Sequence, residues 1–265
     1  MKVAGPSAQA QTVNGNLNMT RKAIMIGSPG PKNSVNYLKG VDADLHHFVS
    51  FLKSPIGGSW EDNEIAGLFK CPSENLIELF HSLHADFLLV YFSGHGHQEL
   101  KEMNIEINDS ESISTSQLIS LINAPKALII IDTCRKFLVK EYSSFSGPEY
   151  LSFKSTLNQS NSREKYMQIL SESTNGISIA YACSVGEISN DTELGGDYTY
   201  SLLKTSLEWY ENQNNESALS INGANDLAHQ YLKFKSNLDQ NPKIVATNDK
   251  DENLNFPFAI KLNSL

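Results

Sequence analysis

The chain has 265 residues, of which 40% are hydrophobic and 19% charged, so it can form one large α/β domain or two small ones with a covered core. The formal net charge of −9 and a pI near 5.3 disfavour nucleic-acid and anionic-membrane partners and mildly favour cationic substrates. The three cysteines, Cys71, Cys134 and Cys183, do not suggest a disulfide framework and fit a reducing compartment.

The first twenty residues are small and polar and lack the apolar region of a signal peptide, so we expect a flexible N-terminal segment over residues 1–20. No stretch approaches about eighteen consecutive apolar residues, the length at which a membrane span is expected. The sequence therefore predicts a cytoplasmic protein with no nucleic-acid and no membrane partner.

Apolar runs and helical spacings predict the elements in chain order. Residues 23–27 form a buried strand that ends at a Gly-Ser-Pro-Gly break, and the spacing of Leu45, Phe48 and Leu52 predicts a helix over 42–53. The remaining expected elements are strand 65–69, helix 72–84, strands 87–92, 127–131 and 177–181, helices 198–210 and 224–234, and a last strand within 254–262.

Strongly apolar strands separated by helical segments are typical of a mainly parallel sheet with helices on both faces. Residues 139–175 differ, because they are rich in Ser, Asn, Gln and Tyr and show little periodicity. A loop of this length inside a compact domain is unusual and often functional. We therefore expect an α/β fold with one long irregular segment.

Two of the apolar strands end in short polar clusters, SGHGHQ (93–98) and DTCR (132–135). The carboxyl ends of parallel strands meet at one edge of a sheet, so His95 and Cys134 emerge side by side if these strands are neighbours. An imidazole beside a thiol can stabilise the thiolate and carry its proton, as a cysteine nucleophile requires.

Gly96 adds to this interpretation, because a residue without a Cβ lets its backbone N–H point at a scissile carbonyl. Together with the N–H of Cys134, it could form an oxyanion hole. Taken singly, Cys134 is more simply an inert buried thiol and His95 a histidine satisfied by its loop. Their joint position at the ends of two apolar strands favours the catalytic interpretation.

The segments VYFSGHG and IIIDTCR together resemble the motifs of caspase-fold cysteine peptidases: caspases, metacaspases and their bacterial relatives. AIMIG with LKGVDADLHHFVSFL is similar to the first strand and helix of that family. ACSVGEISND resembles the start of the small subunit, and LGGDYTYSL a later helix start. The resemblance covers about residues 22–262. It implies a caspase-like fold with a mainly parallel, roughly six-stranded sheet and helices on both faces.

The same resemblance divides the chain into four parts. Residues 1–20 precede the domain, residues 21–138 correspond to a large subunit, residues 139–175 to the junction between subunits, and residues 176–265 to a small subunit. Enzymes of this family are often cut at the junction, so a zymogen is expected.

A protease that prefers basic residues could cut itself in this junction at Lys154, Arg163 or Lys165. The alternative is a surface insertion that is never processed. Some stand-alone bacterial members act in anti-phage defence or regulated cell death, switched on by partners or by processing, and the resemblance implies such a setting by analogy.

The resemblance also predicts specificity position by position. Caspases bind a P1 aspartate through a glutamine and arginines, and at those positions this chain has Asp132, Leu38 and Asp191. Metacaspases carry aspartates at the positions of Asp132 and Asp44 and cleave after Arg or Lys. Buried neighbouring carboxylates are costly unless a cation joins them, and a guanidinium offers bidentate geometry.

We therefore expect Asp132, Asp44 and Asp191 to form a pocket for a basic P1 residue. The simpler alternatives are an exposed helix residue for Asp44 and a turn former for Asp191. We expect the substrate to lie extended along the strand edge near Ala182 and Ser184, by β-augmentation.

Other signals carry less weight, and no cofactor is implied. Acidic residues between Glu99 and Glu111 lie where some metacaspases bind activating calcium, but EF-hand spacing is absent, so a solvated face is favoured. His97 could form a metal-binding pair with His95 and is more simply a rim residue. Cys71 and Cys183 are expected to be core residues.

The sequence thus predicts a cysteine endopeptidase that cleaves a protein or peptide after Arg or Lys. The alternative is a catalytically inactive interaction module on the same fold, since Arg135 departs from the His-Ser-Gly that follows the metacaspase cysteine. A nucleotide-binding domain would need a phosphate loop, and the Gly-Ser-Pro-Gly break lacks both the glycine spacing and the lysine of one.

Overall fold

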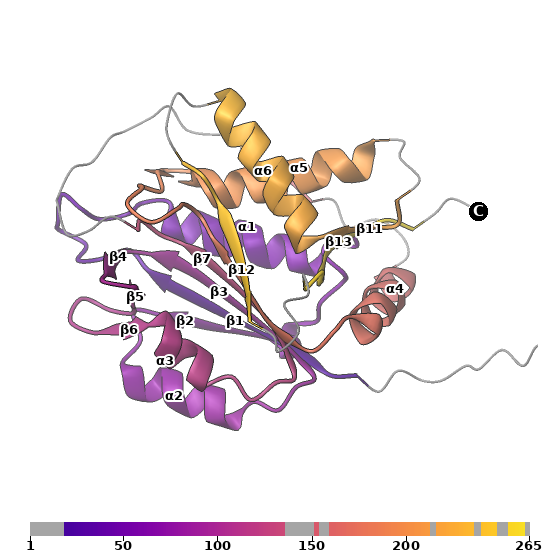
Figure 1. The fold of residues 1–265 in the computed structure, drawn as a ribbon, viewed down its shortest axis with the longest axis horizontal. Helices are drawn as coiled ribbons and strands as arrows, with labels where there is room; N and C mark the ends of the chain where they lie inside the picture. Colours follow the sequence, from indigo (N-terminus) through magenta and orange to yellow (C-terminus); the bar gives the residue numbers. More distant parts are fainter. Residues whose placement is uncertain are drawn as a thin grey trace, which may run out of the picture.

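The computed structural model describes residues 19–135, 151–153, 159–212, 216–235, 240–247 and 254–262. Its centre is a six-stranded sheet with the strand order β12-β8-β7-β3-β1-β2 (Figure 1). These strands are β1 (Arg21–Ser28), β2 (Ile65–Phe69), β3 (Phe87–Gly94), β7 (Lys126–Asp132), β8 (Gly176–Tyr181) and β12 (Lys243–Thr247). Neighbouring strands are parallel except β12 and β8, so the expected α/β fold with a mainly parallel sheet is confirmed.

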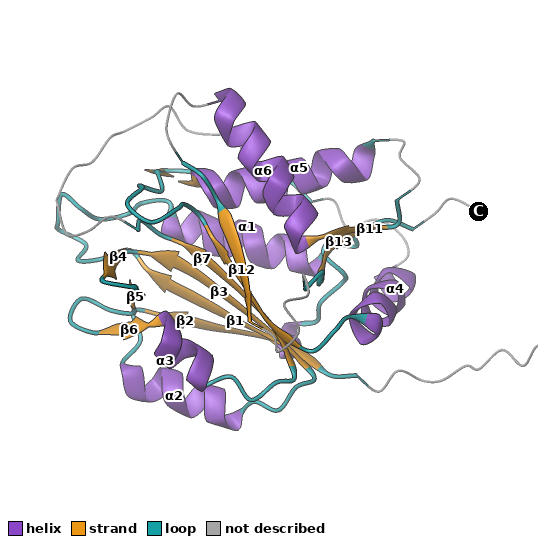
Figure 2. Cartoon of the chain, in the orientation of Figure 1, coloured by secondary structure: helices purple, strands orange, loops and turns teal. Residues whose placement is uncertain are grey.

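The two central strands β3 and β7 are buried at every position, as continuous apolar runs predict for strands covered on both faces. Two hydrophobic clusters lie on opposite faces of the sheet. The larger includes residues of α1 (Val41–Lys53), α4 (Gln159–Glu172), α5 (Asp197–Glu211) and α6 (Ile221–Lys235), and the smaller includes residues of α2 (Ser73–Ser82) and α3 (Thr115–Ser120). Figure 2 shows these helices on the two sides of the sheet.

The sixth strand of the sheet is not the expected one. The apolar segment near the C-terminus forms β13 (Pro257–Ile260), which pairs with β11 (Ala218–Ser220) in a separate two-stranded sheet. The sixth position belongs to β12, an antiparallel edge strand that is largely exposed. The expectation rests on hydrophobicity, which indicates burial. β13 is fully buried and therefore apolar, whereas an edge strand such as β12 needs few apolar residues.

The expectation of an irregular segment over 139–175 is wrong for residues 159–172, which form α4. Its apolar face is narrow, with Tyr166 and Leu170 buried, so the periodicity is weak. Arg163 compensates with an ion pair, since its guanidinium donates to both carboxylate oxygens of Glu64 at 2.8 and 2.7 Å. Glu64, in the short 3₁₀ helix Asp62–Glu64, also accepts from the buried Arg21.

A second small sheet, which no sequence signal indicates, follows β3 directly. It consists of β4 (Gly96–Glu99), β5 (Glu102–Glu106) and β6 (Ser112–Ser114), all antiparallel. Ser114 caps α3 in a reciprocal arrangement with Gln117, which fixes where this sheet ends. The small sheet therefore begins one residue after His95 and borders the edge of the main sheet where β3 ends.

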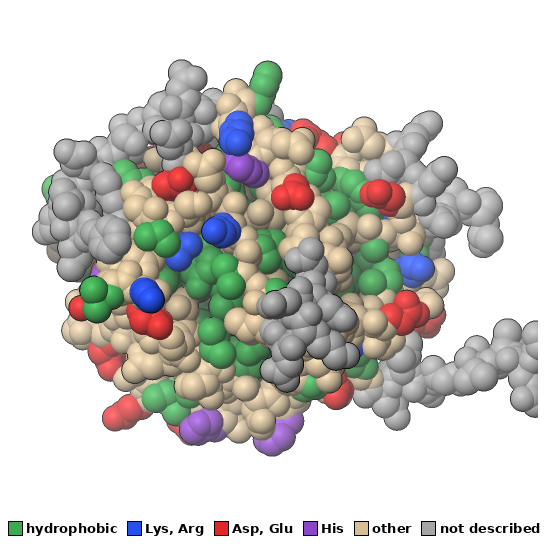
Figure 3. Space-filling view, in the orientation of Figure 1, with side chains coloured by type: hydrophobic (Ala, Val, Ile, Leu, Met, Phe, Trp, Pro, Cys, Tyr) green, Lys and Arg blue, Asp and Glu red, His purple; other side chains and the backbone are tan. Residues whose placement is uncertain are grey.

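Figure 3 shows one face of the molecule, in the orientation of Figure 1. Acidic and basic side chains are interspersed over its described part. Among the described residues, no helix has the length and apolar character to cross a bilayer.

Candidate active site

His95 and Cys134 leave the central sheet at the same edge. Strands β3 and β7 are parallel neighbours, and Ser93 lies opposite Asp132 in their register. His95 follows Ser93 by two positions, and Cys134 follows Asp132 by two positions. The two strands are thus neighbours, which is the condition under which the His and Cys loops come together.

The imidazole of His95 is held by the loop that follows β1. Its backbone N–H donates to the carbonyl of Ser28 at 3.2 Å, and its Nε2 lies 2.6 Å from the carbonyl oxygen of Asn36. A carbonyl only accepts, so Nε2 carries the proton in the neutral ring and Nδ1 is left as the basic nitrogen. The Asn36 contact therefore sets both the orientation and the tautomer of His95.

Cys134 is half-buried and its thiol is free of disulfides. Its Sγ–H donates to the carbonyl of Ser189 at 3.2 Å. By contrast, Cys71 and Cys183 are buried, and burial raises the pKa of both thiols. These two cysteines lie in the core as predicted, and Cys134 is the cysteine at the sheet edge.

Arg135 anchors the loop that carries Cys134. Its backbone N–H donates to Glu187 O at 3.0 Å, and its buried guanidinium lies 4.1 Å above the ring of Tyr181. The guanidinium also donates to Cys183 O and Gln98 Oε1, both at 3.4 Å. Arg135, where the chain departs from the metacaspase motif, thus holds the cysteine loop in place.

Gly96 lies against Thr133, the residue that precedes Cys134. A Cβ on Gly96 would come within 2.8 Å of Thr133 Oγ1 and 2.7 Å of Asn104 O, so a side chain is excluded here. The hydroxyl of Thr133 is buried and forms no hydrogen bond with the described residues. The backbone of Gly96 therefore lies close to the Cys134 loop, as the predicted oxyanion hole would require.

Asp132 is a buried carboxylate held by three hydrogen bonds. Thr199, in the first turn of α5, donates its backbone N–H at 3.0 Å and its hydroxyl at 2.7 Å to Oδ2, and Ser189 Oγ donates to Oδ1 at 2.7 Å. Burial raises the pKa of Asp132, while these hydrogen bonds oppose the rise. The N-terminus of α5 also favours negative charge at this place.

The structure brings Asp44 and Asp191 to the same region. Asp44 is buried and accepts from Gly196 N at 2.9 Å and Ser93 Oγ at 2.7 Å. Burial, with the charge of Asp132 second, raises the pKa of Asp44 well above its usual value. Burial also raises the pKa of Asp191 to about 7, and Asp132 adds to that rise. The reading of Asp44 as an exposed helix residue is therefore wrong.

Glycines make this crowding of carboxylates sterically feasible. A Cβ on Gly40, Gly195 or Gly196 would lie within 2.5 Å of a carboxylate oxygen of Asp191, Asp44 or Asp132, respectively. Within the described residues, none of the three carboxylates forms an ion pair. The nearby Lys39 pairs instead with Glu193 at 2.6 Å on the surface. We name Asp44, Asp132 and Asp191 the carboxylate cluster.

The predicted substrate contacts at Ala182 and Ser184 do not fit the structure. Ala182 is fully buried, its N–H donates to Ile131 O at 3.0 Å, and its carbonyl accepts from Gln240 at 3.1 Å. The N–H of Ser184 donates to Glu187 Oε2 at 2.9 Å. Both N–H groups are used inside the protein, so a substrate strand cannot pair with them here.

Two of the predicted self-cleavage positions, Arg163 and Lys165, lie inside α4. Proteases of this kind bind substrates in extended form, so cleavage there requires α4 to unwind and the Arg163–Glu64 ion pair to break. The third, Lys154, lies outside the described residues.

The acidic stretch after β4 does not converge on one point. Asp109 pairs with Lys70, and Glu111 accepts from Ser73 and Asn108. Within the described residues, no group of three or more His, Cys, Asp or Glu side chains is placed to hold a metal ion. His97 is mostly buried, and its Nδ1 lies 3.6 Å from Glu106 Oε1.

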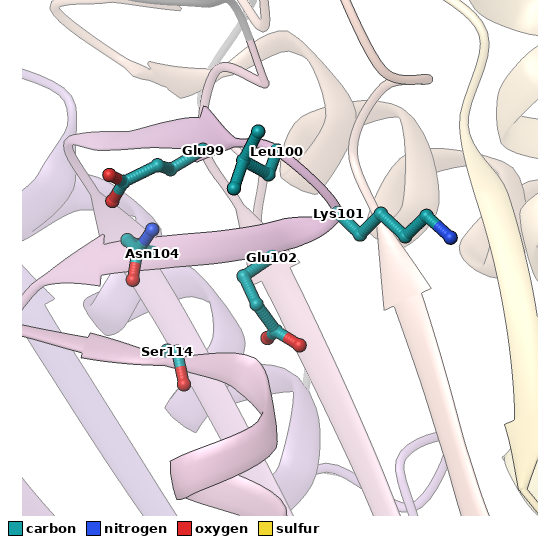
Figure 4. A pocket seen from close by; sticks show the side chains of 6 residues that line it. All are labelled: Glu99, Leu100, Lys101, Glu102, Asn104 and Ser114. Atoms are coloured by element: carbon teal, nitrogen blue, oxygen red, sulfur yellow. The ribbon is translucent and has the colours of Figure 1, made fainter.

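A shallow hollow of about 710 Å³ lies on the small sheet. It is lined by Glu99, Leu100, Lys101, Glu102, Asn104 and Ser114. Figure 4 shows the carboxylates of Glu99 and Glu102 pointing in different directions and Lys101 extending away from both. None of these residues belongs to the predicted site.

Sequence reasoning missed several residues of this site, namely Asn36, Ser93, Ser189 and Thr199. Ser93 could have been found from the strand register, since it stands opposite Asp132. Asn36 acts through a backbone carbonyl, which leaves no trace in residue type. Ser189 and Thr199 come close to Asp132 only through the tertiary fold.

Comparisons with known proteins agree with this geometry. A family model of the caspase domain matches residues 20–252. The chain is similar in structure to protein GSU0716 from Geobacter sulfurreducens, with a TM-score of 0.58, 15% identity, and coverage of 92% of this chain and 100% of the other. It is also similar to caspase-1 from Spodoptera frugiperda, with a TM-score of 0.51, 17% identity, and coverage of 92% and 94%.

At these identities the two solved structures establish the fold alone. A search of curated proteins finds no match. The family model spans most of the chain and includes both motifs, and it is this match that assigns the family. The chain therefore belongs to the caspase-domain family of cysteine peptidases.

Proposed function

We propose that this protein is a cysteine endopeptidase that cleaves protein substrates after Arg or Lys, with Cys134 as the nucleophile and His95 as the proton carrier. The carboxylate cluster carries this proposal. Asp132 lies two residues before the nucleophile and is buried near Asp44 and Asp191, with no ion pair among the described residues. A cationic P1 side chain would supply the positive charge that such a cluster lacks.

The proposed reaction begins with attack of the Cys134 sulfur on the carbonyl carbon of the P1 residue. The thiol proton passes to Nδ1 of His95, while Nε2 keeps its hydrogen bond to Asn36 O. The N–H groups of Gly96 and Cys134 stabilise the oxyanion. Collapse of the intermediate breaks the peptide bond, and the imidazolium gives its proton to the leaving amine. Water, with His95 as general base, then hydrolyses the acyl-enzyme.

The hydrogen bonds of Asp132 support its role as the main P1 ligand. Thr199 fixes one of its oxygens at the N-terminus of α5, which holds the carboxylate in position and favours its charged form. Asp44 and Asp191 have raised pKa values, so they take up protons easily and release them when a cation arrives. Binding of P1 Arg is therefore expected to release protons and to strengthen as the pH rises.

A fluorogenic peptide library varied only at P1 tests the proposal. We expect turnover after Arg and Lys, and its loss by about three orders of magnitude or more in Cys134→Ala. Faster cleavage after Asp than after Arg would refute the pocket assignment. No turnover at any P1 residue, in a protein that is folded and has a free Cys134, would favour the inactive interaction module.

The biological setting remains a prediction from the family resemblance. It comprises residence in the cytoplasm, a zymogen form, an activating partner protein, and a part in bacterial defence or regulated cell death.

A further inference from the structure

Ser189 touches both the carboxylate cluster and the nucleophile. It lies in the loop between β8 and the short strand β9 (Asp191–Thr192) and is 9% exposed. Its hydroxyl donates to Asp132 Oδ1 at 2.7 Å, and its carbonyl accepts a hydrogen bond from the Cys134 thiol at 3.2 Å. One residue therefore connects the proposed P1 ligand to the proposed nucleophile.

The Ser189 contact holds Cys134 as a thiol. An S–H group can donate to a carbonyl, whereas a thiolate cannot and would face the negative end of the carbonyl dipole. Because the thiolate is the attacking species, the sulfur must leave Ser189 O before it reacts. The structure therefore shows a resting arrangement of the nucleophile.

The hydrogen bonds of Asp132 indicate what ends this arrangement. A carboxylate offers about four acceptor positions, and a bidentate guanidinium takes two of them. Three positions on Asp132 are already taken, two by Thr199 and one by Ser189. Thr199 holds both positions of Oδ2, so a guanidinium that donates two N–H groups must place both on Oδ1, and the Ser189 hydroxyl must then yield. Thr199 is fixed within α5, whereas Ser189 lies in a loop and is the donor that can move.

The burial of Asp132 also indicates that Ser189 must move. Asp132 is 5% exposed, so a cation reaches it only if the structure around it opens. The Ser189 hydroxyl also accepts from Gln240 Nε2 at 3.1 Å, while Gln240 Oε1 is buried without a hydrogen-bond partner in the described chain. Once the Ser189 hydroxyl leaves Asp132, it can donate to Gln240 Oε1 instead.

We propose that Ser189 is a positioning residue that couples the two sites: a P1 guanidinium on Asp132 displaces the Ser189 hydroxyl, and the resulting shift of the Ser189 carbonyl releases the Cys134 thiol. This inference rests on the proposed function, because it requires a basic P1 side chain at Asp132. It makes the nucleophile reactive only when the pocket is filled.

Alkylation of Cys134 by iodoacetamide, followed by intact-mass spectrometry, tests the coupling. Butylguanidine serves as the pocket ligand, and the neutral isostere butylurea is its matched control. In the wild-type protein we expect saturating butylguanidine to raise the alkylation rate at least threefold and butylurea to leave it unchanged. Cys134→Ala provides the background from the two buried cysteines.

Two variants separate coupling from a structural role. Ser189→Ala removes the tether to Asp132, so we expect fast alkylation without ligand and no further increase with it. Ser206→Ala removes another buried hydroxyl, one that donates to Leu202 O within α5, and should keep the wild-type response. Slow alkylation in Ser189→Ala, or a ligand response that persists in it, overturns the proposal.

Competition assays distinguish the two failures. Butylguanidine that inhibits cleavage after Arg but does not speed alkylation overturns the coupling and leaves the proposed function intact. Absence of both cleavage after Arg and any effect of butylguanidine on alkylation overturns the proposed function, and the coupling with it.

Discussion

Gly30 lies so close to His95 that a Cβ on Gly30 would come within 2.9 Å of Cδ2 and 3.0 Å of Nε2 of the imidazole ring. Its φ of +84° lies in the left-handed region, where a side chain is also strained. The glycine thus allows the loop after β1 to reach the ring and to place the Asn36 carbonyl on Nε2. This contact gives the Gly-Ser-Pro-Gly segment at the end of β1 a structural role that involves no phosphate.

Gly30→Ala is expected to displace the imidazole and to lower kcat by roughly 10- to 100-fold, since a shift of about 1 Å in a catalytic group has effects of that size. Steady-state kinetics on an Arg substrate measure the change. Gly186→Ala is the matched control, because Gly186 has a φ of +89° and a Cβ there would meet no atom within 4 Å. An equal loss of kcat in both variants would show that backbone strain, rather than contact with His95, is responsible.

The carboxylate cluster is expected to lower stability as the pH rises. The pKa of Asp191 is raised from 3.8 to about 7 in the folded state, so between about pH 4 and 7 the folded protein binds more protons than the unfolded chain. The free energy of unfolding therefore falls through this window. Asp191→Asn removes the effect while its side-chain oxygen can still accept from Gly40 N.

Thermal unfolding at several pH values checks this prediction. The Tm of Asp191→Asn minus that of the wild type should grow from pH 4 to 7 and then level off, reaching several degrees. Asp42→Asn is the control, since Asp42 is exposed on the same helix as Asp44. A constant Tm difference across the whole range would contradict a raised pKa at Asp191.

The same titration should appear in catalysis. As Asp191 ionises through about pH 7, the cluster gains negative charge, and kcat/KM for a P1 Arg substrate is expected to rise. The informative quantity is the ratio of kcat/KM for Arg to that for the neutral isostere citrulline, because effects of pH that are common to both substrates cancel in this ratio. The ratio should rise roughly tenfold or more from pH 5.5 to 8 and stay flat if the cluster does not contact P1.

Much of the fold could be predicted because a continuous apolar run, as in β3 and β7, is a strong signal of a buried strand. Their apolar runs indicate central strands, and the polar residues that follow indicate the active edge. The misplaced sixth strand has the opposite cause, since the exposed edge strand β12 needs little hydrophobicity while the buried β13 resembles a core strand. Hydrophobic pattern reports burial and not sheet membership.

The site was less predictable where it depends on contacts between distant segments. Asp132, Asp44 and Asp191 were identifiable by position within the family, but the bonds of Asp132 to Ser189 and Thr199 join residues 57 and 67 positions apart. The predicted substrate contact at Ala182 is wrong because the N–H and carbonyl of Ala182 already form hydrogen bonds within the protein. No local sequence pattern indicates such bonds. The sequence does not indicate helix α4 because an ion pair with Glu64 replaces part of the apolar face that would produce a helical pattern.

Self-processing, where it occurs, is expected to spare α4. Arg163 and Lys165 are helical, and the ion pair of Arg163 with Glu64 adds to the cost of unwinding. Intact-mass analysis after prolonged incubation should therefore show no fragment that ends at either residue. Cys134→Ala serves as the inactive control, and a fragment that ends at Arg163 or Lys165 in the active protein alone would contradict the prediction.

The most direct measurement uses two chloromethyl ketone peptides that differ only in P1, Arg in one and Asp in the other. Each is incubated with the protein, and the modified residue is located by peptide mass spectrometry. We predict that the Arg reagent alkylates Cys134 at least 100-fold faster than the Asp reagent, and that Asp132→Asn removes most of this preference. Faster labelling by the Asp reagent, or labelling at a residue other than Cys134, would contradict the central claim.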